Sequence, residues 1–266
     1  MRRIAVLALA LALAAWAPPP GTSRSGPEDR DWNWGGRVDR GDAIEIKGIN
    51  GEISAELASG NEVEVEARLE GRDDDPDEIE MVVLEHNNGV TICAVYPSDD
   101  PDEPNECRPG GHGRMNVRDN YDVSVDFIVR VPAGVHFIGR TVNGDLEAFG
   151  LEGDVKAHTV NGSVDVTTSG LAQATTVNGS ITVSMGRADW EGSMDFTTVN
   201  GSVTLEFPGE LDCEVSVSTV NGHIASDYPL TVHGRFSPRH LKGTIGDGGR
   251  ELVVKTVNGS VQIRRS

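Results

Sequence analysis

The chain has 266 residues, enough for one large all-β domain or two ordinary ones, and a core of that size needs no external staple. Its formal charge is −19, and removing residues 1–17 takes away two of the 23 basic side chains and none of the 42 acidic ones, so the charge becomes −21. Such a charge repels nucleic acid and anionic phospholipid, so we expect no nucleic-acid partner. It suits solubility, cation binding or a basic partner.

Residues 1–17 are typical of a signal peptide. An arginine pair precedes the apolar run Ile4 to Trp16, which is too short for an ordinary transmembrane helix, and Ala15-Trp16-Ala17 offers a cleavage site. Pro18 would hinder that cleavage, so an uncleaved anchor stays open. We expect an exported protein in the periplasm, on the cell surface or secreted, with no transmembrane domain in the mature chain if the signal is cleaved.

The rest of the chain divides into three parts. Residues 18–35 are rich in Pro, Gly, Ser and charge and predict a linker, although the chain becomes strand-like from Trp32. Residues 36–135 predict an irregular β region with acidic loops, because runs such as Val123 to Val131 alternate apolar and polar side chains. Residues 136–266 carry regular repeats, and 36–266 are expected to form one continuous domain. Trp32 and Trp34 are interpreted as a cap on one end, with sugar stacking as the alternative.

Two acidic loops, Asp73 to Glu78 and Asp99 to Glu106, interrupt the first half. Hard cations such as calcium bind carboxylate oxygens, but neither loop has the ligand spacing of an EF-hand. Pro76, Pro101 and Pro104 also restrict how these loops could wrap an ion. We interpret them as solvated loops and expect no cofactor, with calcium as the open alternative.

The three cysteines fit an oxidising compartment. Alternation in residues 90–96 places Cys93 on the side opposite Ile92, so we expect it to point outward. Cys107 lies in the polar loop that follows. Cys213 shares a face with Val215, which is the expected core face. We therefore predict a Cys93–Cys107 disulfide and a reduced, buried Cys213.

The second half repeats the motif Thr-Val-Asn-Gly-Ser-Val, and its asparagines are 18, 17, 22, 21 and 37 residues apart. The last spacing is close to two periods, and Thr231-Val232-His233-Gly234 is a candidate for the skipped copy. Asn50, in a weak first copy, lies 93 residues before Asn143, near five periods, which suggests degenerate coils in the first half. The predicted repeat turns are Asn143-Gly144, Asn161-Gly162, Asn178-Gly179, Asn200-Gly201, Asn221-Gly222 and Asn258-Gly259.

Each copy predicts a strand, an Asn-Gly corner, a second strand and a second corner. Asn and Gly are expected to supply backbone angles that β-branched residues cannot adopt. Identical side chains at one place in six copies suit stacked coils, where Thr and Asn can bond along the stack. We expect Thr and the valines inward, and Ser163, Ser180, Ser202 and Ser260 as outward strand residues. The predicted fold is an all-β parallel β-helix or β-solenoid with coils of about 18–22 residues; the alternative is an antiparallel β-sandwich or meander.

These residues resemble the bacterial putative-adhesin β-strand-repeat family, a domain of unknown function. The resemblance rests on the repeated motif, on the weak first copy at residues 48–53, on Val129-Arg130-Val131-Pro132 and on Gly243-Thr244-Ile245-Gly246, and covers about residues 36–266. It implies a β-solenoid at the cell envelope, an adhesin label and, in some relatives, an association with envelope-stress systems. It implies no catalytic residue.

No pattern of side chains names a reaction. The seven histidines are dispersed, His158 and His223 are expected at exposed positions beside repeat turns, and no serine lies in Gly-x-Ser-x-Gly. Asp145, Asp165 and Glu206 are interpreted as solvated strand-face acids. We expect a non-catalytic exported envelope protein, not an enzyme, with an adhesin-like surface for an unknown protein or glycan. The alternatives are a carbohydrate-active enzyme on a β-helix scaffold or an envelope-stress accessory protein.

Overall fold

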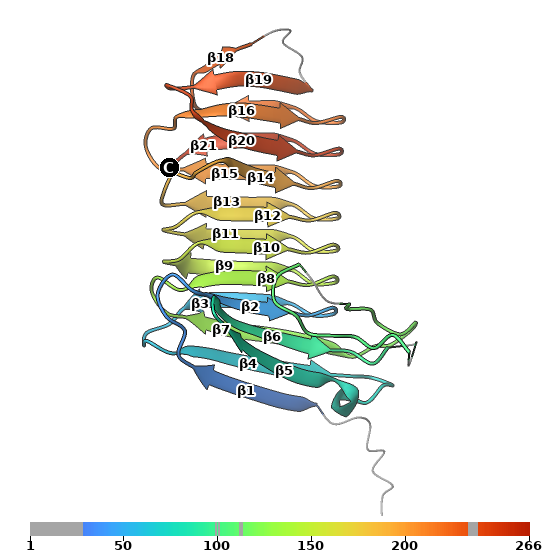
Figure 1. Cartoon of the computed structure of the whole chain (residues 1–266). Helices are drawn as coiled ribbons and strands as arrows, with labels where there is room; N and C mark the ends of the chain where they lie inside the picture. The colour runs from blue at the N-terminus through green and yellow to red at the C-terminus, as the bar shows by residue number, and fades with distance from the viewer. Residues whose placement is uncertain (1–28, 99, 101, 112–113, 234–238) are drawn as a thin grey trace, which may run out of the picture.

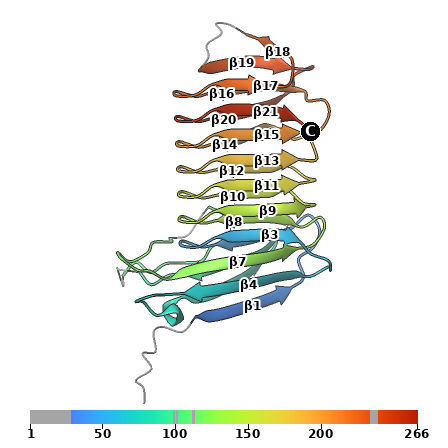
Figure 2. The same ribbon diagram turned by 180° about the vertical axis from the view of Figure 1, so that it is seen from behind.

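The computed structural model describes residues 29–266 apart from 99, 101, 112–113 and 234–238. Two sheets face each other, a ten-stranded sheet A and an eleven-stranded sheet B, which Figures 1 and 2 show from opposite sides. The predicted signal peptide and the start of the predicted linker lie outside the described residues. No closed barrel is formed by the described strands, and the predicted β-solenoid is confirmed.

Most of the chain folds into coils of two short strands, one in each sheet, with parallel neighbours along the stack. The strands of the coils are β2 (Ala43–Lys47), β3 (Ile53–Leu57), β8 (His136–Arg140), β9 (Leu146–Leu151), β10 (Val155–His158), β11 (Val164–Thr168), β12 (Ala172–Thr175), β13 (Ile181–Met185), β14 (Ser193–Thr197), β15 (Val203–Phe207), β16 (Cys213–Ser218), β17 (Ile224–Ser226), β20 (Arg250–Lys255) and β21 (Val261–Arg265).

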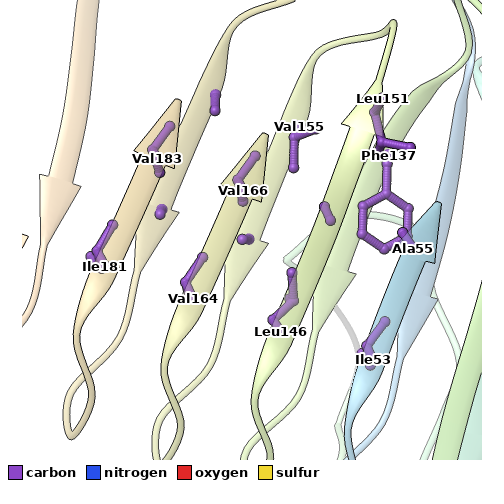
Figure 3. Close-up of a cluster of buried hydrophobic side chains, with 14 of the residues drawn as sticks. Ile53, Ala55, Phe137, Leu146, Leu151, Val155, Val164, Val166, Ile181 and Val183 are labelled. Atoms are coloured by element: carbon purple, nitrogen blue, oxygen red, sulfur yellow. The ribbon is translucent and has the colours of Figure 1, made fainter. Parts of the chain in front are cut away.

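The core lies between the two sheets and follows from period-2 alternation. In β13, for example, Ile181, Val183 and Met185 point inward and are buried, while the intervening Thr182 and Ser184 face outward. Figure 3 shows how Ile181 and Val183 repeat, one coil further on, the positions of Val164 and Val166. Each coil therefore buries its apolar side chains against the same positions of its neighbours.

The N-terminal half does not consist of degenerate coils, and that prediction is wrong. Asn50 bridges directly to Asn143, and β3 pairs in parallel with β9, so the 92 residues between these asparagines place no coil between their two layers. Apart from β3 and β8, which belong to the coils, those residues form longer strands at the end of the stack, with antiparallel pairs β4–β7 and β5–β6. Eight-residue strands such as β4 and β7 are too long for a coil of 18 residues. The elements of this end are β1 (Arg30–Gly36), β4 (Val63–Glu70), η1 (Pro76–Glu78), β5 (Glu80–His86), β6 (Gly89–Val95) and β7 (Ser124–Val131).

The predicted linker, residues 18–35, is wrong at its end, because β1 begins at Arg30 and pairs with β4. Trp32 and Trp34 alternate inward on this last strand of sheet A and pack, half-buried, against the core. Their large apolar rings provide the packing that turns this segment into a strand. The position agrees with the interpretation of both tryptophans as an end cap.

At the C-terminal end the coils do not stack in chain order. After β15 the chain passes over one layer, builds β16–β17, adds the antiparallel strands β18 (Leu230–Val232) and β19 (His240–Ile245), and then returns. Its last strands fill the omitted layer, so the order is β14-β20-β16 in sheet B and β15-β21-β17 in sheet A (Figures 1 and 2). The copy expected at Thr231 is therefore wrong: the wide spacing reflects a layer filled later by Asn258.

Candidate interaction surface

The asparagines of the corners form one side-chain ladder. Seven asparagines, Asn50 included, are joined in spatial order by bonds of 2.7–2.8 Å from each Nδ2 to the Oδ1 of its neighbour. Asn258 lies between Asn200 and Asn221 in this ladder, as the interleaved order requires. The amides along the ladder are thus used by the scaffold itself.

The corner glycines are required by close packing of coils rather than by unusual backbone angles. A Cβ on Gly162 or Gly179 would stand 1.9–2.0 Å from the carbonyl oxygen of the corner glycine in the neighbouring coil, and the same holds for Gly144, Gly201, Gly222 and Gly259. None of these six has a φ in the left-handed range, although Gly51 has φ 120°. The expectation that they supply special backbone angles is therefore wrong for these six glycines.

The corner threonines point inward, as expected, and bind that same carbonyl. Thr159, Thr176, Thr198, Thr219 and Thr256 are buried, and each Oγ1 donates at 2.8–2.9 Å to the corner-glycine oxygen of the adjacent coil. A buried carbonyl that lacked this donor would cost about 1–3 kcal/mol. This hydroxyl is therefore part of the scaffold.

The valine between Thr and Asn faces outward, contrary to the expectation that all motif valines are inward. Val160, Val177, Val199, Val257 and Val220 are 36–50% exposed, because they lie at the turn rather than in a strand. The serines after the corner glycine also lie in the turn, not in the strand as predicted. The Oγ atoms of Ser163, Ser180 and Ser202 accept the backbone N–H of the next serine in the stack at 3.1–3.3 Å.

A disulfide-linked loop covers the outer side of sheet B at β2 and β6. Cys93 and Cys107 are joined as predicted, with their Cα atoms 5.8 Å apart, and Cys213 is free and buried. Cys93 stands outside the core, but it is fully buried, so its expected exposure is wrong. The loop that carries Cys107 lies over it, and Lys47 Nζ donates to the carbonyls of Arg108 and Gly110 at 2.7 and 2.8 Å.

Beneath this loop lies a buried polar cluster. Glu45 is only 3% exposed and binds the guanidinium of Arg140 at 2.8 Å and the backbone N–H of Gly110 at 2.8 Å. Burial lowers the pKa of Lys47. His158, on the next coil, is half-buried rather than exposed as expected. This burial, together with the charge of Arg140, lowers the pKa of His158 to about 4, so its imidazole is neutral at pH 7.

The acidic loops bind their own backbone and arginines. The carboxylate of Asp122 accepts the N–H groups of Arg72, Asp73 and Asp74, and these bonds lower its pKa. Asp74 also binds Arg118 at 3.2 Å. Within the described part of the chain, no group of three or more His, Cys, Asp or Glu side chains is arranged to hold a metal ion.

The strand-face acids do not converge. Asp145 lies at a corner, where its carboxylate accepts the N–H of Ser163 at 2.7 Å. Asp165 and Glu206 both face outward on sheet A, but on β11 and β15, with β13 between them, and in different rows. Burial raises the pKa of Asp165. With about 4.8 Å between strands and about 3.3 Å per residue, these two carboxylates stem from positions roughly 12 Å apart.

Large apolar side chains stand on the outer face of sheet A, where solvated polar residues are the rule. Ile128 on β7 and Phe149 on β9 are 45% and 44% exposed. They flank β3, where Ser54 pairs with Ile128 on one side and Glu56 pairs with Phe149 on the other. Alternation places both residues outward, so the sequence signal for this surface is a large apolar residue at an outward strand position.

A groove of about 290 Å³ begins at Ile128 and runs over β7, β4 and β1. The polar side chains that line it are Asp31, Asn33, Glu66, Arg68 and Asp126. Together, the groove, Ile128, Phe149 and the carboxylates of Glu52, Asp126 and Glu147 are called the sheet A patch. Figure 2 faces the strands that carry it, β1, β4, β7, β3 and β9, at the lower end of the stack.

Carboxylates crowd around the sheet A patch. Partial burial, followed by the charges of Glu147, Asp126 and Asp145, raises the pKa of Glu52. Arg130 is the basic side chain nearest to Phe149 in register, and it already binds Glu56, Glu64 and Glu66 at 2.6–3.3 Å. The patch therefore combines two exposed apolar side chains with an excess of carboxylates.

Among the described residues, we find no helix of the length and apolarity that crossing a membrane requires. The family described as Toastrack DUF4097 matches residues 140–264, which confirms the resemblance to a domain of unknown function. No curated protein matches the chain significantly.

Among solved structures, the chain matches a putative cell adhesion protein from Clostridium sporogenes, with 10% identity, a TM-score of 0.45, and 90% of this chain and 100% of that chain covered. A putative adhesin from Bacteroides fragilis has 12% identity and a TM-score of 0.28, with 90% and 99% covered. A putative lipid binding protein from Parabacteroides distasonis has 12% identity and a TM-score of 0.24, with 91% and 98% covered.

Proposed function

We propose that this chain is a non-catalytic exported protein of the cell envelope, and that its solenoid presents an adhesin-like surface to a protein or glycan. The observation that carries the proposal is the sheet A patch. Exposed Ile128 and Phe149 stand on a rigid sheet, whereas the Thr, Asn and Gly groups of the repeat are used by the scaffold. Exposed apolar patches that are rimmed by polar residues mark interaction sites on soluble proteins.

The acids support a binding role better than a glycosidase role. Glycoside hydrolysis uses two carboxyls about 5–10 Å apart on both sides of the sugar bond. Asp165 and Glu206 stem from positions roughly 12 Å apart on an open sheet face. A carbohydrate-active enzyme is therefore the second candidate, and an envelope-stress accessory protein differs from the first only in its partner.

The test uses the full-length chain with a C-terminal tag. Cell fractionation should recover the protein from the envelope or the culture fluid, and the purified protein should capture a defined envelope component in a saturable way. A panel of bacterial polysaccharides should stay uncleaved after incubation with it. Recovery from the cytoplasm alone, or cleavage of a polysaccharide, would contradict the proposal.

A further inference from the structure

We infer that the sheet A patch binds a cationic amphipathic segment, in which arginine or lysine side chains and apolar side chains share one face. This inference rests on the proposed function, because it names the class of partner for the same surface. Its first support is the pair of exposed apolar side chains in the patch. Ile128 and Phe149 lie two strands and two residues apart, roughly 12 Å, and Ser54 and Glu56 of β3 stand between them.

The groove provides the second support. It has about 290 Å³, close to the lower end of pockets that take small ligands, roughly 300 Å³. Ile128 forms one wall. The polar part of the lining has three carboxylates, one amide and one guanidinium: Asp31, Glu66, Asp126, Asn33 and Arg68. A long basic side chain would fit this chemistry, since its stem can lie along Ile128 while its charged end meets the carboxylates.

The distribution of charge over the molecule is the third support. All four lysines of the chain, Lys47, Lys156, Lys242 and Lys255, stand on the outer side of sheet B. The cations of the sheet A patch, Arg68 and Arg130, are already paired with carboxylates. A bound cation would relieve the remaining repulsion among Asp126, Glu147 and Glu52. An anionic partner or the same patch of a second copy would add to that repulsion.

An extended segment matches the form of the surface. Residues i and i+2 of such a segment face the same way and lie about 6.7 Å apart, so alternate apolar and basic side chains can contact the apolar side chains and the carboxylates of the patch in turn. The probe is therefore a fluorescent peptide with three repeats of Leu-Ser-Arg-Ser, in which every second residue is Leu or Arg. Two control peptides carry Ala in place of Leu, or Glu in place of Arg.

Anisotropy titrations of the full chain measure the affinity at low and at high salt. The Leu-Arg peptide should bind, the Ala-Arg peptide should bind about tenfold more weakly, and the Leu-Glu peptide should not bind. Ile128→Ser combined with Phe149→Ser should weaken binding about tenfold, which corresponds to about 1.4 kcal/mol. Asp126→Asn combined with Glu147→Gln should weaken it and reduce its salt dependence.

The matched control is Val177→Ser combined with Val199→Ser, which removes exposed apolar side chains from the corner instead and should leave the affinity unchanged. Thermal melts confirm that each variant is folded. Equal binding of the Leu-Arg and Ala-Arg peptides, or equal affinity of the patch and corner variants, would overturn the inference. Sedimentation showing a dimer that the Ile128 and Phe149 changes dissociate would also overturn it, because the occupant would be a second copy.

Failure of this inference is distinguishable from failure of the proposed function. If the peptide does not bind but capture of the envelope component still depends on Ile128 and Phe149, the surface is right and the class of partner is wrong. If fractionation places the protein in the cytoplasm, or a polysaccharide is cleaved, the proposed function fails whatever the peptide does.

Discussion

Substitution of a corner glycine tests why the repeat needs glycine. In Gly179→Ala the added Cβ would stand 1.9 Å from the carbonyl oxygen of Gly162, whereas real Cβ contacts stay above 3.0 Å. The two coils must therefore separate by about 1 Å in a packed interior. That shift affects three bonds: Thr176 Oγ1 to Gly162 O, Asn178 Nδ2 to Asn161 Oδ1, and Gly162 N to Asn178 O, now 2.8, 2.8 and 3.0 Å.

At about 1 kcal/mol for each bond, the variant should lose about 3 kcal/mol of unfolding free energy. For a chain of this size that corresponds to a fall in Tm of about 6–12 °C. Urea denaturation and thermal melts measure both quantities. The matched control is Gly60→Ala, because a Cβ on Gly60 meets no atom within 4 Å, and its stability should change by less than about 0.5 kcal/mol. If Gly179→Ala and Gly60→Ala have the same Tm, close approach of the coils is not the reason why glycine recurs at this position in each copy.

Three further predictions concern the ends of the stack, the covering loop and pH. A chain that ends at residue 249 lacks β20 and β21 and leaves an open layer, so hydrogen exchange should show lost protection in residues 213–233 and 239–245. Native protection there would refute the interleaved order. Cys93→Ser combined with Cys107→Ser opens a 14-residue link and should lower the unfolding free energy by about 3 kcal/mol, with faster exchange in residues 102–111. The control Cys213→Ser should leave exchange in that loop unchanged. His158 has a folded pKa of about 4, below its unfolded value, so protonation of the unfolded chain should reduce stability as pH falls from about 6.5 to 4. Between pH 7 and 4.5, the unfolding free energy of His158→Gln should fall by about 1–2 kcal/mol less than that of the native chain, allowing for the partial exposure of His158. Urea denaturation at the two pH values measures this difference. An equal fall in both proteins would contradict the assigned burial.

Much of the scaffold could be predicted from the sequence because each copy repeats the same local chemistry. Alternation identified the inward residues of strands such as β13, and the buried corner threonines followed from the same period. The disulfide could also be predicted from the sequence, since Cys107 lies in the loop after the strand of Cys93. What alternation could not show is burial by a loop, so Cys93 was expected outside and is instead covered.

The order of the layers could not be predicted, because spacing along the chain does not specify neighbours in space. A gap of 37 residues between Asn221 and Asn258 suits a skipped copy as well as a layer left open and filled later. Likewise, a gap of 93 residues near a multiple of the period suggested coils, while the eight-residue strands β4 and β7 form an antiparallel pair. Long-range pairing decides both cases, and it leaves no local signal.

The central claim is that binding belongs to the sheet A patch and not to the repeated corners. Capture of the envelope component by three folded proteins tests it directly: the native chain, Ile128→Ser with Phe149→Ser, and Val177→Ser with Val199→Ser. Each pair removes two apolar side chains of 36–45% exposure, from β7 and β9 or from the corners. We predict that the patch variant loses about nine-tenths of the capture, as a tenfold weaker affinity implies at limiting concentration, while the corner variant keeps it. Loss in the corner variant, with full capture by the patch variant, would contradict the account.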